Sequence, residues 1–210
     1  MAITDQAMST YSPSRLSTYE QCPRRYRFKY VDKIPRDEIQ TIEAFTGGLV
    51  HDALERLYTK LRQGTLMTRE AVLEYFDSLW NKGWNKEIRI VRDEMLPEQY
   101  KEHGRRCLSL YYARYAPFDQ GETLGLEVRV FFPLDEGGRY MIEGYIDRLV
   151  RNRDGTLEIH DYKTSSGNLP GKNELRSDRQ VCLYHLGAQR EWGNGQPIRA
   201  IWHFLALDEE

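Results

Sequence analysis

The chain has 210 residues, of which 40% are hydrophobic and 30% are charged. This length supports one well-packed domain without disulfide bonds, and the composition is that of a globular protein rather than a disordered one. Because 30 Lys and Arg residues face 32 Asp and Glu residues, the net charge is −2. No global basic field therefore points to nucleic acid.

No targeting signal is expected from the sequence. Residues Met1 to Thr10 lack the charged start and apolar run of a secretory signal, and no stretch approaches the roughly 20 apolar residues of a membrane-spanning helix. The three cysteines, Cys22, Cys107 and Cys182, are widely spaced and form no CxxC pair. This usage argues against a secreted disulfide framework and predicts a cytoplasmic protein without a membrane partner.

The first segment of the chain is basic and aromatic. Ser12-Pro13 is typical of a helix start, and a second short helix is expected from Arg24 to Val31. Its basic side chains, Arg24, Arg25 and Arg27 among them, alternate with aromatic ones. This pattern predicts contact with single-stranded nucleic acid. It fits equally well an amphipathic helix whose rings pack inward and whose arginines face solvent.

The next part of the chain is helical in character. After Gly47-Gly48, apolar residues recur at helical spacing, and from Met67 to about Phe118 the sequence remains helical, with Pro97 starting a new helix. We therefore expect a single domain over residues 1–210 with a helical sub-lobe at about 65–118. The remaining core comprises about 12–62 and 122–207.

Strand periodicity then begins abruptly. The apolar residues from Leu124 to Phe132 alternate with other residues, which places Glu127 on the side opposite Leu124 and Val128. Two further strands, 139–150 and 157–164, predict a three-stranded meander. A helix over 174–192 and a strand-like run over 199–207 follow. The fold class is therefore α/β.

Charged residues on the second and third strands suggest a metal site. Asp161 and Lys163 lie two apart and share one face of their strand, and pairing through the turn at 152–155 would bring Asp147 close to Asp161. Two neighbouring carboxylates repel each other unless a cation lies between them, and Mg²⁺ prefers such oxygen ligands. Taken alone, however, an Asp-x-Lys triplet in a strand is most often a surface ion pair.

Five ordered motifs together change this balance. They are the opening SPSRLSTYEQCPRRYRFKY, Gly-x-x-x-His at 47–51, GYID at 144–147, Asp-Tyr-Lys at 161–163, and Gln-x-x-x-Tyr at 180–184. In this order they resemble the PD-(D/E)XK nuclease superfamily, and within it the RecB-like nucleases, which include the nuclease domains of RecB and AddB and the CRISPR-adaptation nucleases. The resemblance implies a restriction-endonuclease-like core, a mixed central sheet flanked by helices.

The resemblance also implies roles for single residues. Asp147, Asp161 and Lys163 would be catalytic, and a Mg²⁺ or Mn²⁺ ion would be held by His51, Asp147 and Asp161. Glu127 would be an auxiliary acidic residue, and Gln180 and Tyr184, together with Arg24, Arg25 and Arg27, would bind substrate. Each of His51, Gln180 and Tyr184 also has an ordinary explanation as a packed or hydrogen-bonded residue of a helix.

The activity implied is hydrolysis of DNA phosphodiester bonds, with the metal ion lowering the pKa of a water molecule. We expect an exonuclease on single strands or duplex ends in DNA repair, recombination or CRISPR adaptation, working with a helicase or a CRISPR-adaptation protein. A non-catalytic nucleic-acid-binding or adaptor subunit that keeps the fold is the alternative, and a structure-specific endonuclease is a weaker one.

Some relatives of this kind hold a [4Fe–4S] cluster with one early cysteine and three late ones. Cys22 matches the first of these, but no cysteine follows Tyr184. A cluster normally requires four thiolates, so we expect none in this chain. Either the chain belongs to a cluster-free branch, or a cysteine group lies beyond Glu210.

Overall fold

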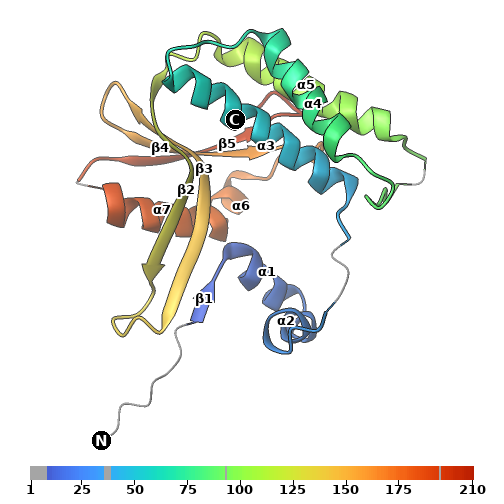
Figure 1. Ribbon diagram of the computed structural model, residues 1–210. Helices are drawn as coiled ribbons and strands as arrows, with labels where there is room; N and C mark the ends of the chain where they lie inside the picture. The colour runs from blue at the N-terminus through green and yellow to red at the C-terminus, as the bar shows by residue number, and fades with distance from the viewer. Residues whose placement is uncertain (1–8, 36–38, 93, 194) are drawn as a thin grey trace, which may run out of the picture.

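The computed structural model describes residues 9–35, 39–92, 94–193 and 195–210 (Figure 1). Most of the segment in which the sequence predicts no targeting signal therefore lies outside the described residues. The elements follow in this order: β1 (Ser9–Tyr11), α1 (Pro13–Gln21), α2 (Pro23–Tyr26) continued by a π-helical turn (Arg27–Val31), α3 (Ile42–Arg62), α4 (Arg69–Gly83), α5 (Pro97–Tyr115), β2 (Gly121–Pro133), β3 (Tyr140–Asn152), β4 (Leu157–Lys163), α6 (Lys172–Arg176), α7 (Arg179–Trp192) and β5 (Ile198–Phe204).

The sheet is mixed and centres on β3. Strand β2 pairs antiparallel with β3 along nearly its whole length, β3 pairs antiparallel with β4, and β4 pairs parallel with β5. The predicted meander is thus confirmed, and the last strand completes the sheet. The sequence did not predict β1, which pairs parallel with β3 at 140–142, whereas β4 pairs with β3 at 148–151. Within the described chain, no strand pairs with residues 143–147 on this edge of β3.

Helices cover both faces of the sheet, as expected for the fold class. Helices α3, α4 and α5 pack together on one side, and α7 lies on the other (Figure 1). Threonine side chains cap α3 and α4, where Thr41 and Thr68 accept hydrogen bonds from backbone N–H groups three residues later. One apolar cluster joins α3 to α4 and α5 across the predicted boundary between core and sub-lobe. That division of the chain stays a prediction.

Two predicted helical regions are interrupted. The described residues between Gly83 and Pro97 connect α4 to α5 without forming a helix. The helix predicted over 174–192 is also wrong as a single element, because α6 ends at Arg176 and α7 begins at Arg179. The reason is a new N-cap: the Asp178 carboxylate accepts a hydrogen bond from the Val181 N–H at 3.1 Å.

The predicted single apolar row of β2 is wrong as well. Leu124 and Val128 pack against the cluster under α7, whereas Leu126 packs against the helical cluster on the other face. Two irregularities cause this change: the register of β2 shifts between Thr123 and Gly125, and Glu127 has a φ of 46°. The strict alternation of side chains holds only for a regular strand.

Close packing between α4 and α5 yields a stability prediction. A Cβ atom on Gly104 of α5 would lie 2.5 Å from Cζ of Phe76, a fully buried ring. We expect Gly104→Ala to lower the free energy of unfolding by about 1–3 kcal/mol, measured by urea denaturation. Gly48→Ala is the matched control, because nothing lies within 4 Å of its Cβ position in α3. The control should gain about 0.5–1 kcal/mol of stability, and equal effects of the two substitutions would contradict the packing argument.

Candidate active site

The site begins where β3 and β4 separate. Their backbone pairing runs from Arg151↔Leu157 to Arg148↔His160 and would continue with Asp147 opposite Asp161. Instead, the N–H of Tyr162 donates to Oδ2 of Asp147 at 2.8 Å. The Asp147 carboxylate therefore takes the place of a backbone acceptor and is fixed in direction.

His51 is held by the same residue. Its Nε2 atom lies 2.9 Å from the carbonyl oxygen of Tyr162, and a carbonyl can only accept, so Nε2 carries the hydrogen. Nδ1 then faces Oδ2 of Asp147 at 3.5 Å. In the neutral ring, this nitrogen has a free lone pair directed toward the carboxylate, the arrangement seen in histidines that bind metal ions.

Glu127 completes a group of three potential ligands. The flanking pairs Leu126↔Arg148 and Val128↔Ile146 place Glu127 opposite Asp147 on the neighbouring strand. One ligand atom each from His51, Glu127 and Asp147 lie within 4.8 Å of one another. Glu127 thus stands with the other two, although only an auxiliary role is predicted for it from the sequence.

The electrostatics of this group fit a cation. Burial raises the pKa of Glu127, and the neighbouring Asp147 raises it further. Burial also raises the pKa of Asp147, even though His51 and the Tyr162 N–H lower it. Glu127 is exposed and Asp147 is partly buried, but two neighbouring carboxylates beside a histidine lone pair still repel each other without a positive charge between them. The donor set is therefore suited to a divalent metal ion.

Asp161 lies beside this group with partners of its own. Its Oδ2 is 2.7 Å from Nζ of Lys163, and its Oδ1 accepts a hydrogen bond from Gln180 at 2.9 Å. Asp161 is only 3% exposed. Burial raises the pKa of Asp161 to about 6 despite the Lys163 ammonium, and Asp147 raises it as well. Its role as a metal ligand stays a prediction.

Helix α7 brings Gln180 and Tyr184 to the same place. The Gln180 amide donates to Asp161 and also to the Tyr184 hydroxyl, at 3.3 Å. The Tyr184 ring packs over Gly144 of β3, where an added Cβ would lie 2.4 Å from Cε1 of the ring. The glycine of the GYID motif therefore leaves room for this tyrosine beside the aspartates.

An aromatic cage behind the strands fixes Tyr162 from the other face. The hydroxyls of Tyr58, Tyr111 and Tyr162 form a chain with O···O distances of 2.6 and 3.2 Å. The guanidinium of Arg148, 7% exposed, lies 3.9 Å from the centre of the Tyr58 ring. It forms no ion pair with any described carboxylate. The face of the Tyr58 ring stabilises its charge instead, through a cation–π contact.

The predicted residues thus fall into two groups. The structure brings together His51, Glu127, Asp147, Asp161, Lys163, Gln180 and Tyr184. It does not join Arg24, Arg25 or Arg27 to them by any contact among the described residues. These arginines lie on α2 and the turn after it, which Figure 1 shows in the lower part of the molecule, on the far side of α1 from α7. There Arg27 pairs with Asp32 at 3.1 Å.

In the segment formed by α1, α2 and the π-helical turn, some aromatic rings pack inward, as expected for an amphipathic helix. Tyr26 packs against the rings of Tyr19 and Tyr30, and Arg15 lies over it. Phe28 remains 39% exposed. Cys22 acts locally, since its sulfur accepts a hydrogen bond from the Arg25 N–H at the start of α2. A role for these arginines in binding DNA stays a prediction.

Two features of the site were not predicted from the sequence: the backbone contacts of Tyr162 and the cage around Arg148. Strand alternation correctly places the Tyr162 side chain away from Asp161 and Lys163, but it says nothing about where its N–H and C=O groups point. Their places in the sequence were the available hint of a role at the site: Tyr162 lies between two site residues, and Arg148 follows Asp147 directly.

Comparison with known proteins decides the family. The sequence model of the PD-(D/E)XK nuclease superfamily matches residues 10–209. The chain belongs to this superfamily. It is also similar to a subunit of an ATP-dependent helicase/deoxyribonuclease from Carboxydothermus hydrogenoformans, with 29% identity over 176 residues. That match covers 75% of this chain and 16% of the relative, so the chain spans only a small part of that protein's length.

The described helices and the cysteines of this nuclease-superfamily chain have ordinary properties. No helix in the described ranges has the length and apolar character needed to cross a bilayer. Its three cysteines are free, and Cys107 is buried. Burial raises the pKa of the Cys107 thiol to about 11, which keeps it protonated and unreactive at neutral pH.

Metal binding by the three-residue group can be measured directly. We expect Mn²⁺ to raise the thermal unfolding temperature of the wild-type chain, because the ion binds only the folded state. Asp147→Asn should weaken Mn²⁺ binding about tenfold or more in isothermal titration calorimetry. Asp119→Asn is the control, because its carboxylate is 66% exposed and lies outside the group. Equal Mn²⁺ affinity in the two variants would exclude this site.

The raised pKa of Asp161 predicts a pH-dependent stability. Its folded pKa of about 6 exceeds the ordinary aspartate value of 3.8, so the folded state holds the proton more tightly than the unfolded state does. The stabilisation by protonated Asp161 is therefore full below about pH 4 and is lost as pH rises through about 6. Asp161→Asn should stabilise the metal-free protein by about 1–3 kcal/mol at pH 7.5.

Urea denaturation at pH 4, 6 and 7.5 in the presence of EDTA tests this expectation. The gain from Asp161→Asn should grow with pH, whereas Asp119→Asn should show no such trend. A gain that is constant across the three pH values would contradict the proposed ionisation of Asp161.

Proposed function

We propose that the chain is a metal-dependent deoxyribonuclease that hydrolyses phosphodiester bonds at the site formed by β2, β3, β4 and α3. The observation that carries the proposal is the meeting of two groups in one place. His51, Glu127 and Asp147 form a potential cation site, and the ion pair of Asp161 and Lys163 lies beside it. Superfamily membership supports the reaction class.

The proposed metal ion is Mg²⁺ or Mn²⁺, held by His51, Glu127 and Asp147, with Asp161 as the further ligand that the resemblance implies. When bound, such an ion polarises a phosphoryl oxygen and lowers the pKa of a water molecule. Carboxylates suit both ions, and the imidazole of His51 adds a nitrogen ligand.

The protein side chains have separate tasks in this proposal. Lys163 is 35% exposed, so its ammonium can reach a phosphate oxygen while it remains next to Asp161. There it would offset the negative charge that develops in the transition state. Gln180 orients the Asp161 carboxylate through its hydrogen bond, and Tyr184 supports Gln180. The Tyr162 peptide keeps Asp147 and His51 in a fixed relation.

We further propose that the substrate is DNA, attacked at single strands or duplex ends, and that the chain works together with a helicase. The similarity to part of a helicase/deoxyribonuclease supports this assignment, although the match covers a small part of that protein. DNA repair or recombination fits this partner. The expected link to CRISPR adaptation has no support from this similarity and stays a prediction.

Cleavage assays with linear and circular DNA test the proposal. We expect Mn²⁺-dependent degradation of linear 5′-labelled strands, and we expect Lys163→Met to lower kcat at least about 100-fold because a charge in the transition state loses its partner. Asp161→Asn should have a similar effect. Lys82→Met is the control, since Lys82 is an exposed lysine of α4.

The outcomes separate the alternatives. Degradation of linear but not circular DNA indicates an exonuclease, and cleavage of both indicates an endonuclease. Binding of DNA without any cleavage supports an adaptor subunit instead. Cleavage that survives both Lys163→Met and Asp161→Asn would exclude this site as the origin of the activity.

A further inference from the structure

A cavity of about 410 Å³ is lined in part by Thr164, the residue that follows the proposed catalytic lysine in the chain. Its walls come from α3, from the connection between α4 and α5, from α5, and from the loop at 164–167 that follows β4. Pockets that hold small organic ligands measure roughly 300–1,000 Å³, so this one can take a group the size of a nucleotide.

The cavity has a fixed relation to the site through Thr164. This residue follows Lys163 in the chain, and its carbonyl oxygen lies 2.7 Å from Nε2 of His103 in α5. On the α3 side, the Cβ position of Gly47 is 3.1 Å from Oγ1 of Thr164, so a larger residue there would press on the loop. Thr164 thus connects the backbone of the proposed catalytic lysine to one wall of the cavity.

Several hydrogen-bond donors of the loop are available for a ligand. The backbone N–H groups of Ser165, Ser166 and Gly167, and the hydroxyls of both serines, have no hydrogen-bond partner in the described part of the chain. Arg92 also lines the cavity and is exposed. Arginine, serine hydroxyls and backbone N–H groups are the usual partners of DNA phosphate oxygens.

The rest of the wall suits a base and its sugar. Met95 supplies an apolar chain and His103 an aromatic ring, on which a base can stack. Glu43 is the acidic side chain among the described lining residues, and it accepts a hydrogen bond from the Tyr100 hydroxyl at 3.1 Å. Its carboxylate can also accept a hydrogen bond from an amino group of a base.

We propose that this cavity binds the nucleotide that adjoins the scissile phosphate. Arg92 and the loop at 165–167 hold that nucleotide's phosphate, and Met95 and His103 contact its base and sugar. This inference rests on the proposed nuclease function and adds to it a subsite that orients the DNA strand across Lys163. Its residues bind substrate and take no part in the bond cleavage itself.

Substitution of Arg92 tests the subsite. The probe is a 5′-fluorescein-labelled 20-nucleotide single strand, with KM and kcat measured in Mn²⁺ and Kd measured by fluorescence anisotropy in Ca²⁺. Arg92→Ala should raise KM and Kd about 3- to 10-fold and keep kcat within twofold. It should also reduce the slope of log Kd against log salt concentration by about one, because one phosphate contact is lost. The double variant Ser165→Ala, Ser166→Ala should raise KM in the same way.

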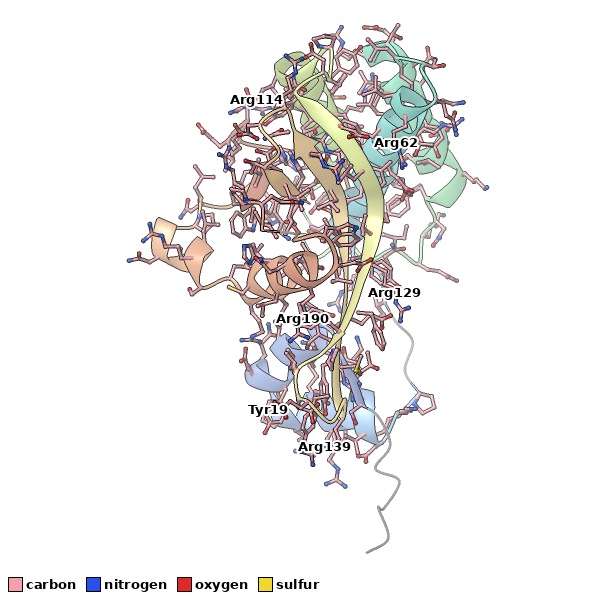
Figure 2. All side chains as sticks on the ribbon, turned by 90° about the vertical axis from the view of Figure 1, so that its left-hand side faces the viewer. Tyr19, Arg62, Arg114, Arg129, Arg139 and Arg190 are labelled. Carbon is pink, nitrogen blue, oxygen red and sulfur yellow. The ribbon has the colours of Figure 1, made fainter. Side chains whose placement is uncertain are left out.

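Arg62→Ala is the matched control. Arg62 is also an exposed arginine, but it ends α3, whereas the cavity adjoins the start of that helix, and Figure 2 shows it in the upper part of the molecule. This variant should keep the wild-type KM, Kd and salt dependence. The salt dependence matters because a purely structural role of Arg92 would leave it unchanged.

The results distinguish the two proposals. If the wild type cleaves DNA but Arg92→Ala and the double serine variant match it in KM, Kd and salt dependence, the subsite is wrong and the nuclease function stands. If the wild type binds but cleaves no DNA, the nuclease function is wrong, and the Kd and salt dependence of Arg92→Ala decide on the subsite. No binding and no cleavage by the wild type would overturn both.

Discussion

The peptide backbone of Tyr162 is the interaction on which the site depends. Its N–H fixes Asp147 and its C=O fixes His51, while the residues on either side of it, Asp161 and Lys163, project from β4 toward α7. One residue thus connects a helix and two strands from distant parts of the sequence. A shift of β4 by one residue would exchange its two faces and separate all four side chains.

Rigidity on the reverse face offsets the electrostatic strain of the site. Carboxylates with raised pKa values disfavour the folded protein near neutral pH when no cation is bound. The opposite face of the same strands carries the tyrosine chain and the caged Arg148, packed into the helical core. Functional groups are commonly held in unfavourable positions by well-packed neighbours. Here the site carboxylates and the packed tyrosines lie on opposite faces of β3 and β4.

Much of this arrangement follows from the sequence, and the exceptions have physical causes. Strand periodicity and a short turn sufficed to predict the meander and to place Asp147 beside Asp161. The single apolar row predicted for β2 fails because the strand has a register shift and a positive φ at Glu127, which strand periodicity does not reveal. The break before α7 depends on the Asp178 cap, which competes with helix continuation. The backbone contacts of Tyr162 could not be predicted, since patterns of side chains carry no information on where single peptide groups point.

The pairing of β1 with β3 has a consequence for the order of folding. Ser9 pairs with Tyr140, so β1 can be placed only after the chain has been synthesised as far as β3. The helices α3, α4 and α5, by contrast, lie close together in the sequence and can associate early. Contacts between distant residues form slowly because closing a long loop costs entropy. The helices α1 and α2 are therefore expected to join the fold after α3, α4 and α5, although they precede those helices in the chain.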